Sequence, residues 1–189
     1  MVKRKKRKEY VVFSEKTSPE DIDLFLITLF GYNDICFGSC VKEGLSNIIF
    51  SFYEQGGLAM NGGILFFDKE KKIFPSCCCG LENWKEVQES INNKKSPWLG
   101  HDPFPVFEYE KEMVHVWSDD CIGVYGKEQP KEKLICLDYP IDFLKEQLFY
   151  VKRDLYKFIT IPLYKRIKDL ESGIVDSFVE MMLVWLLNK

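Results

Sequence analysis

The chain has 189 residues, of which 46% are hydrophobic, 15% aromatic and 29% charged, with a formal net charge of -3. This length and apolar content suit one folded domain and exclude a disordered chain. No uninterrupted apolar stretch reaches the roughly 20 residues of a membrane-spanning helix. The basic start is not followed by an apolar segment of signal-peptide length, so we expect a cytoplasmic protein.

Charge is distributed unevenly along the chain. Residues 1–13 hold six basic residues and one acid (+5), residues 14–120 hold nine Lys and 18 acids (-9), and residues 121–189 hold 11 basic and ten acidic residues (+1). We predict a disordered basic arm over residues 1–9, followed by a single domain over residues 10–189. Nucleic-acid binding is disfavoured, because the arm has no aromatic residue to stack on bases and the acidic body would repel phosphate.

The first third of the chain predicts a strand, a helix and a second strand. Aromatic and β-branched residues favour a strand over residues 10–13. A helix follows, with Ser18 as N-cap, Pro19 in the first turn and Gly31 as the stop. Residues 32–45 are ambiguous, and the Ile- and Phe-rich residues 47–54 predict a strand.

The middle of the chain predicts hairpins around a helix. Residues 56–75 predict sheet, with a polar turn at 68–72. Gly80 precedes a helix whose apolar residues follow helical spacing to Ile91. A second hairpin is expected from strands over residues 106–109 and 113–117.

The last third predicts a strand and then helices. Residues 134–137 favour a strand, and Pro140 begins a helix with an amphipathic stripe from Phe143 to Phe158. Pro162 should break or kink this helix. The almost wholly apolar residues 174–187 predict a final helix that is either buried or an interface. The expected fold class is α+β: a mainly antiparallel sheet, with helices packed on one face and a helical C-terminal region.

The seven cysteines suggest a reducing compartment. They are Cys36, Cys40, Cys77, Cys78, Cys79, Cys121 and Cys136. An odd count without a signal peptide favours free thiols over a disulfide framework. Neighbouring residues of an extended chain point to opposite sides, so the Cys77–Cys79 run is not expected to share one ion. We predict no metal and no cofactor; the alternative is a site built by Cys36 and Cys40 with His101 or His115.

Residues 96–105 form the most unusual segment, with three prolines, a glycine, a Trp and a Phe. Such a stiff loop loses little entropy when it orders, which suits recognition, although Trp98 and Phe104 could equally pin the loop to the core. His101 with Asp102, and Asp119 with Asp120, are pairs that could hold a metal or transfer protons. No enzyme motif accompanies them: phosphate-binding loop, dinucleotide fingerprint, nucleophile elbow and zinc-protease helix are all missing from the sequence.

Several segments resemble small uncharacterised bacterial cytoplasmic proteins, similar to the immunity proteins of polymorphic and contact-dependent toxin systems. The resemblance is carried by residues 63–68 (GILFFD), 75–84 (PSCCCGLENW), 96–103 (SPWLGHDP) and 117–119 (WSD), and by the later stretch 143–170. It implies a protein-binding inhibitor without chemistry of its own, and it brings no set of catalytic residues.

We therefore expect a non-enzymatic protein that neutralises a partner toxin, such as a basic domain, by occluding its active surface. The expected contact residues are Trp98, His101, Asp102, Phe104, Glu108, Glu110, Asp119 and Asp120. Two alternatives remain open. One is a metal-dependent hydrolase that uses His101, Asp102, Asp119 and Asp120, and the other is a homodimeric structural module that pairs through the 174–187 helix.

Overall fold

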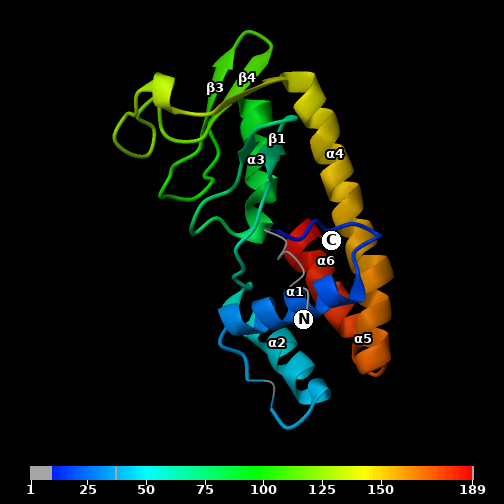
Figure 1. Ribbon diagram of the computed structural model, residues 1–189. Helices are drawn as coiled ribbons and strands as arrows, with labels where there is room; N and C mark the ends of the chain where they lie inside the picture. Colours follow the sequence, from blue (N-terminus) through cyan, green and yellow to red (C-terminus); the bar gives the residue numbers. More distant parts are fainter. Residues whose placement is uncertain (1–9, 37, 189) are drawn as a thin grey trace, which may run out of the picture. The chain divides into compact units, whose positions relative to one another are not determined.

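The computed structural model describes residues 10–36 and 38–188 (Figure 1). The predicted basic arm, residues 1–9, lies outside the described residues. The chain divides into two compact units. We call Met1–Leu58 with Lys152–Lys189 the helical unit, and Ala59–Val151 the sheet unit. Whether residues 10–189 fold as a single domain stays a prediction.

The helical unit is built from α1 (Pro19–Tyr32), α2 (Val41–Gln55), the end of α4 (Ile141–Phe158), α5 (Tyr164–Leu170) and α6 (Val175–Leu187). The first predicted helix is confirmed: the Ser18 hydroxyl oxygen accepts a hydrogen bond from the Asp21 N–H, and Pro19 lies in the first turn. The capping residue thus satisfies a backbone donor that the helix itself leaves unpaired.

The two strands predicted before residue 55 are wrong. Residues 47–54 belong to α2, which buries Leu45, Ile48 and Phe52 at helical spacing and ends at Gly56 in a left-handed conformation. The Ile and Phe content resembles a strand, but the 3-and-4 spacing of the buried residues decides the structure. Residues 10–13 form no strand either, and their Phe13 packs its ring against Phe158.

Pro162 does not break its helix, which was one of the two outcomes predicted. Between α4 and α5 the chain makes a π-helical turn, Ile159–Leu163, which contains Pro162 and buries Ile159 and Leu163. A wider turn relieves the clash between a proline ring and the preceding turn, and it accommodates the missing N–H. The segment therefore stays helical from Ile141 to Leu170.

The sheet unit contains both predicted hairpins, although within the predicted sheet segment 56–75 only residues 66–67 and 72–73 form strands. Strands β1 (Phe66–Phe67) and β2 (Lys72–Ile73) form a two-stranded sheet. Strands β3 (Val106–Glu110), β4 (Met113–Trp117) and β5 (Cys136–Pro140) form an antiparallel sheet in that order. Strand β5 starts two residues later than predicted, and α4 begins immediately after it. The helix predicted after Gly80 is α3 (Trp84–Asn93).

One face of the larger sheet forms the core of this unit. Phe107, Val114, Val116 and Leu137 point inward, where they pack with residues of α3 and the start of α4. The opposite face carries polar side chains, because strand residues alternate between the two faces. These observations confirm the α+β class, with antiparallel sheets, helices on one face of the larger sheet, and a helical C-terminal region.

The core of the helical unit gives a stability prediction. Phe158 is fully buried and lies against the rings of Phe13 and Phe25, with centroids 4.4 and 5.5 Å away. Phe158→Ala should lower the free energy of unfolding by about 3–5 kcal/mol, because it removes buried apolar contacts and leaves a cavity. Phe50→Ala, at a 65% exposed position of α2 in the same unit, is the control. Denaturant unfolding followed by circular dichroism measures both, and equal losses would contradict this core assignment.

Candidate functional site

Two loops of the sheet unit bring most of the predicted contact residues together. We call residues 96–105 the aromatic loop and residues 118–129 the Asp120 loop. The Asp119 carboxylate accepts a hydrogen bond from the Phe104 N–H at 2.9 Å. The Tyr125 hydroxyl donates to the Ser96 carbonyl at 2.8 Å. The loops are therefore fastened to each other at two points.

Asp120 organises its own loop from within. Its side chain is buried, and one carboxylate oxygen accepts hydrogen bonds from the N–H groups of Ile122 and Val124. The other oxygen accepts from the N–H groups of Tyr125 and Gly126, both at 2.7 Å. The carboxylate accepts hydrogen bonds from four backbone N–H groups, which in a helix or strand would donate to backbone carbonyls. Asp120 therefore has a structural position, and its side chain is not on the surface where we expected a partner contact.

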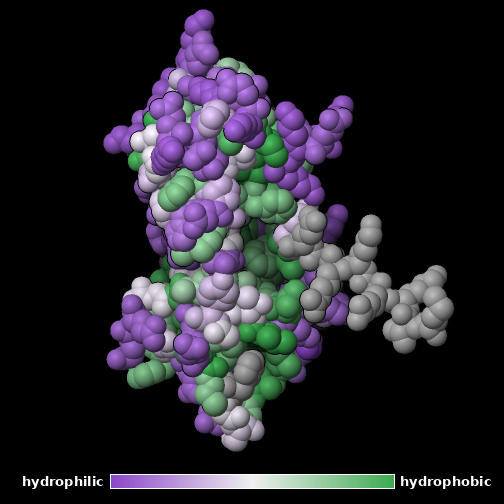
Figure 2. Space-filling view, turned by 60° about the vertical axis from the view of Figure 1, so that its left-hand side comes forward, coloured by the Kyte–Doolittle hydropathy of each residue, from purple (hydrophilic) through white to green (hydrophobic). Residues whose placement is uncertain are grey.

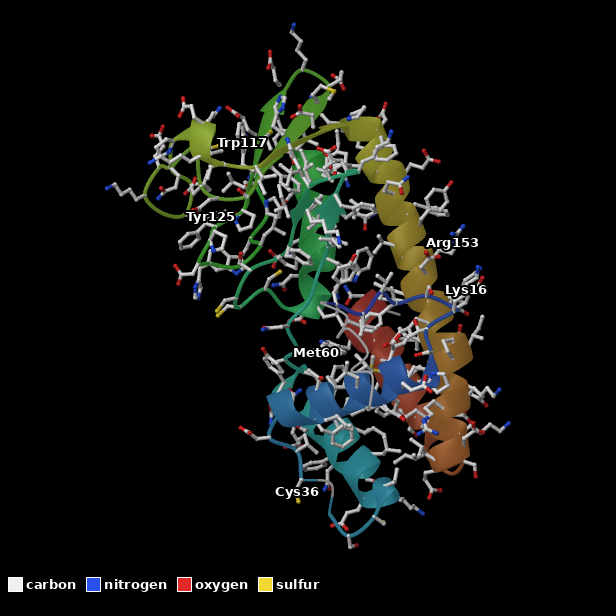
Figure 3. All side chains as sticks on the ribbon, in the orientation of Figure 1. Lys16, Cys36, Met60, Trp117, Tyr125 and Arg153 are labelled. Atoms are coloured by element: carbon white, nitrogen blue, oxygen red, sulfur yellow. The ribbon has the colours of Figure 1, made fainter. Side chains whose placement is uncertain are left out.

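The rings of the two loops form a half-exposed cluster. The Trp98 ring lies with its centroid 5.3 Å from that of Tyr125 and 5.9 Å from that of Phe104, both edge to face. His101 lies 6.1 Å from Phe104. Figure 3 labels Tyr125 in this loop and Trp117 at the end of β4. Trp98 and Phe104 are partly buried, so they hold the loops together and also present ring surface to solvent. Sequence reasoning missed Tyr125, which only its contacts reveal.

A group of three potential metal ligands lies beside the aromatic loop. It consists of Cys77, Cys78 and His101, whose ligand atoms all lie within 4.8 Å of one another. The expectation that adjacent cysteines point apart is wrong here, because Cys78 has a left-handed backbone (φ 65°) and the two Sγ atoms lie 3.4 Å apart. Residue spacing alone does not reveal such a turn.

A second polar group lies on the outer face of the larger sheet. His115 Nδ1 is 2.7 Å from Asp138 Oδ1, and the Cys136 thiol donates to the same oxygen at 3.3 Å. His115 and Asp138 are paired across β4 and β5. The hydrogen bond from His115, together with that from Cys136, holds the pKa of Asp138 below its ordinary value.

Glu108 and Glu110 lie on the same outer face, at β3. Lys131 Nζ donates to both oxygens of Glu108, and the Trp117 indole N–H donates to one of them. The Lys131 hydrogen bond lowers the pKa of Glu108 despite partial burial. Glu108 is thus engaged within the chain, whereas the Glu110 side chain is 72% exposed.

Of the predicted hydrolase residues, only His101 belongs to a group of potential metal ligands in the described part of the chain. His101 and Asp102 are hydrogen-bonded, with Nδ1 and Oδ2 3.2 Å apart. Asp119 and Asp120, however, accept backbone hydrogen bonds, and neither belongs to a metal-ligand group among residues 10–36 and 38–188. Cys36 and Cys40 belong to the helical unit, whereas both histidines belong to the sheet unit.

The apolar residues of α6 are mostly buried within the helical unit. They include Phe178, Met181, Met182 and Leu186. Several exposed large apolar residues of this unit lie instead on α1 and α2, among them Leu24, Ile27, Phe50 and Tyr53. Figure 2 shows hydrophobic side chains, in green, gathered on part of the helical unit, whereas the drawn face of the sheet unit is largely hydrophilic.

Comparison of the chain with protein-family models, with curated proteins and with solved structures found no match in any of the three. Among the described residues, none of the helices has the length and apolar character that crossing a membrane requires.

The Asp120 loop gives a pH-dependent stability prediction. Burial raises the pKa of Asp120, but its four backbone hydrogen bonds outweigh burial and leave the pKa below its ordinary value. Its contribution is therefore present above the unfolded pKa and is lost as the pH falls through the folded one. Asp120→Asn puts an NH₂ group against N–H donors and should lower the free energy of unfolding at pH 7 by about 3 kcal/mol.

The difference between Asp120→Asn and the natural chain should shrink as the pH falls through the folded pKa of Asp120, because the natural carboxylate then becomes protonated. Urea unfolding at a series of pH values measures it. Asp142→Asn is the matched control, because the Asp142 side chain is 95% exposed in the same unit. Equal stability of Asp120→Asn and the natural chain at pH 7 would refute the structural role.

The sheet-face group gives a reactivity prediction. Burial, together with the hydrogen bond to Asp138, raises the pKa of the Cys136 thiol to about 12. At pH 8 only about one Cys136 in ten thousand would then be a thiolate, so alkylation should be slow. Asp138→Asn removes the neighbouring negative charge and should speed alkylation of Cys136 several-fold. Peptide mass spectrometry after timed iodoacetamide treatment measures the rate, with exposed Cys36 as internal reference; an unchanged ratio would contradict the assignment.

Proposed function

We propose that the chain is a non-enzymatic protein-binding protein of the immunity type, which neutralises a toxin by covering its active surface. The observation that carries this proposal is a pair of loops joined to each other by hydrogen bonds. These loops present a cluster of half-exposed aromatic rings. A surface that is ordered before binding loses little conformational entropy when a partner arrives. Such a surface favours recognition of another macromolecule.

The composition of this surface fits a protein partner. Aromatic side chains such as Trp98 and Phe104 supply much of the energy of protein interfaces when they fill pockets of a partner. The same unit also carries exposed carboxylates: the side chain of Asp102, in the aromatic loop, is 86% exposed, and that of Glu110, at the end of β3, is 72% exposed. Acidic groups at a rim accelerate association with a basic surface. A basic toxin domain is therefore the partner class that we propose.

The resemblance of the 96–103 and 117–119 segments to immunity proteins supports the same class of function. Both segments lie in or next to the two loops. The hydrolase alternative is weaker, because Asp119 and Asp120 have backbone partners. The homodimer alternative was based on an apolar face of the 174–187 helix that would need a partner. It is weaker because α6 buries most of its apolar residues inside the helical unit.

Co-expression with the protein domains encoded beside this chain tests the proposal. The chain should protect cells from one of them and should co-purify with it. Trp98→Ala should weaken that complex at least about 30-fold, which is the effect of losing a central aromatic anchor. Phe149→Ala, at an exposed ring of α4 in the same unit, is the matched control and should bind normally.

Charge reversal at the rim provides a second measurement on the same complex. Asp102→Lys with Glu110→Lys should slow association at low salt, whereas Asp142→Lys, elsewhere in the unit, should not. Stopped-flow or surface-based kinetics measure the rates, and thermal unfolding shows that each variant is folded. The proposal fails if the neighbouring domains kill cells regardless of the chain and none is retained by it.

A further inference from the structure

The Cys77–Cys78–His101 group has the donor chemistry of a zinc site. Zinc in proteins is held by thiolates and imidazole nitrogens, with Zn–S about 2.3 Å and Zn–N about 2.0 Å in tetrahedral geometry. Around such an ion two sulfurs lie about 3.8 Å apart, and a sulfur and a nitrogen about 3.5 Å apart. The Sγ atoms of Cys77 and Cys78 lie 3.4 Å apart, and Cys77 Sγ lies 4.0 Å from His101 Nε2. Each of these two distances differs by about half an ångström from its value around a bound ion, and the ligand atoms of all three residues lie within 4.8 Å of one another.

The backbone brings these side chains together before any ion is bound. Cys77 and His101 face each other in an antiparallel bridge, in which the His101 N–H donates to the Cys77 carbonyl at 3.0 Å. The Ser76 N–H donates to the Leu99 carbonyl at 2.7 Å. Gly100, between Leu99 and His101 in the chain, has a φ of 92°. A Cβ atom at this position would overlap the Cys77 carbonyl oxygen. The close approach of the two segments therefore requires a glycine.

The orientation of the imidazole also matches a metal ligand. His101 Nδ1 is within hydrogen-bond distance of the Asp102 carboxylate, while Nε2 faces the thiols. In metal sites the outer nitrogen of a ligating histidine is commonly held by a carboxylate, which fixes the ring and its tautomer. The sheet-face group differs, because His115 Nδ1 and the Cys136 thiol both lie against one oxygen of Asp138. In that group the carboxylate, and not an imidazole nitrogen, is the hydrogen-bond partner of the thiol.

We propose that Cys77, Cys78 and His101 bind one zinc ion, with Asp102 as the residue that positions the imidazole. Cys77 and Cys78 are exposed, so the ion can enter from solvent. Binding would release the thiol protons, so affinity should rise with pH. Since this group offers three ligand atoms, a tetrahedral ion would keep its fourth position for water or for a ligand from another molecule. The inference does not depend on the proposed function.

Metal titration of the full chain tests the proposal. The protein is reduced, freed of metal with a chelator and checked by intact mass for free thiols, and Zn²⁺ is then titrated against a chromophoric chelator. We expect one equivalent to bind. Co²⁺ should give a thiolate-to-metal charge-transfer band and the intense visible bands of tetrahedral cobalt.

Variants identify the ligands. Cys77→Ser, Cys78→Ser and His101→Gln should each abolish stoichiometric zinc binding, and Asp102→Asn should weaken it about 10–100-fold. Cys136→Ser, in the sheet-face group, is the matched control and should bind as the natural chain does. Circular dichroism shows whether each variant is folded, so loss of zinc binding by a folded Cys78→Ser reports a lost ligand rather than lost stability.

Three results would overturn the proposal. The first is no zinc binding by the reduced natural chain. The second is full binding by Cys77→Ser or His101→Gln, and the third is loss of binding in Cys136→Ser with retention in the other variants.

Discussion

The buried carboxylate of Asp120 is the interaction on which the surface of the sheet unit depends. Four backbone N–H groups converge on it, and they set the path of residues 121–126 without a helix or strand. That path places Tyr125 where its hydroxyl reaches Ser96 and its ring meets Trp98. The conformation of the aromatic loop therefore depends on a buried charged group, the Asp120 carboxylate. A buried charge is tolerated because its hydrogen bonds are all made locally.

Regular elements with local signals were predictable from the sequence. Helix α1 begins at a serine cap followed by proline, and the hairpin of β3 and β4 follows from alternation around a polar turn. Residues 47–54 of α2 were predicted as a strand, because their Ile and Phe content suits either structure. The burial of Leu45, Ile48 and Phe52 at helical spacing identifies the segment as a helix. The effect of Pro162 was only partly predictable: the helix does not break there, because a π-helical turn accommodates the proline ring and its missing N–H.

The candidate site was predictable in its residue types but not in its geometry. Trp98, His101, Asp102 and Phe104 stand in one conspicuous segment, and the structure keeps them together. The pairing of that segment with Cys77 and Cys78 spans more than 20 residues and depends on the left-handed backbone at Cys78 and on Gly100. The left-handed backbone at Cys78 could not be predicted from the sequence, because residues with a Cβ atom, such as cysteine, disfavour this conformation. Tyr125 is a similar case, since its role follows from hydrogen bonds made by Asp120.

The acidic residues before residue 121 differ in how far their charges are available to a partner. The excess of acid before residue 121 suggests a broad negative surface, yet its members differ in availability. Asp120 is buried, Asp119 accepts backbone N–H groups, and Glu108 is paired with Lys131. Asp102 and Glu110 project into solvent, and exposed charges of this kind act on the approach of a partner more than on the affinity of the final complex. In the proposed complex the rings would supply the binding energy, and these exposed carboxylates would speed the association of a basic partner.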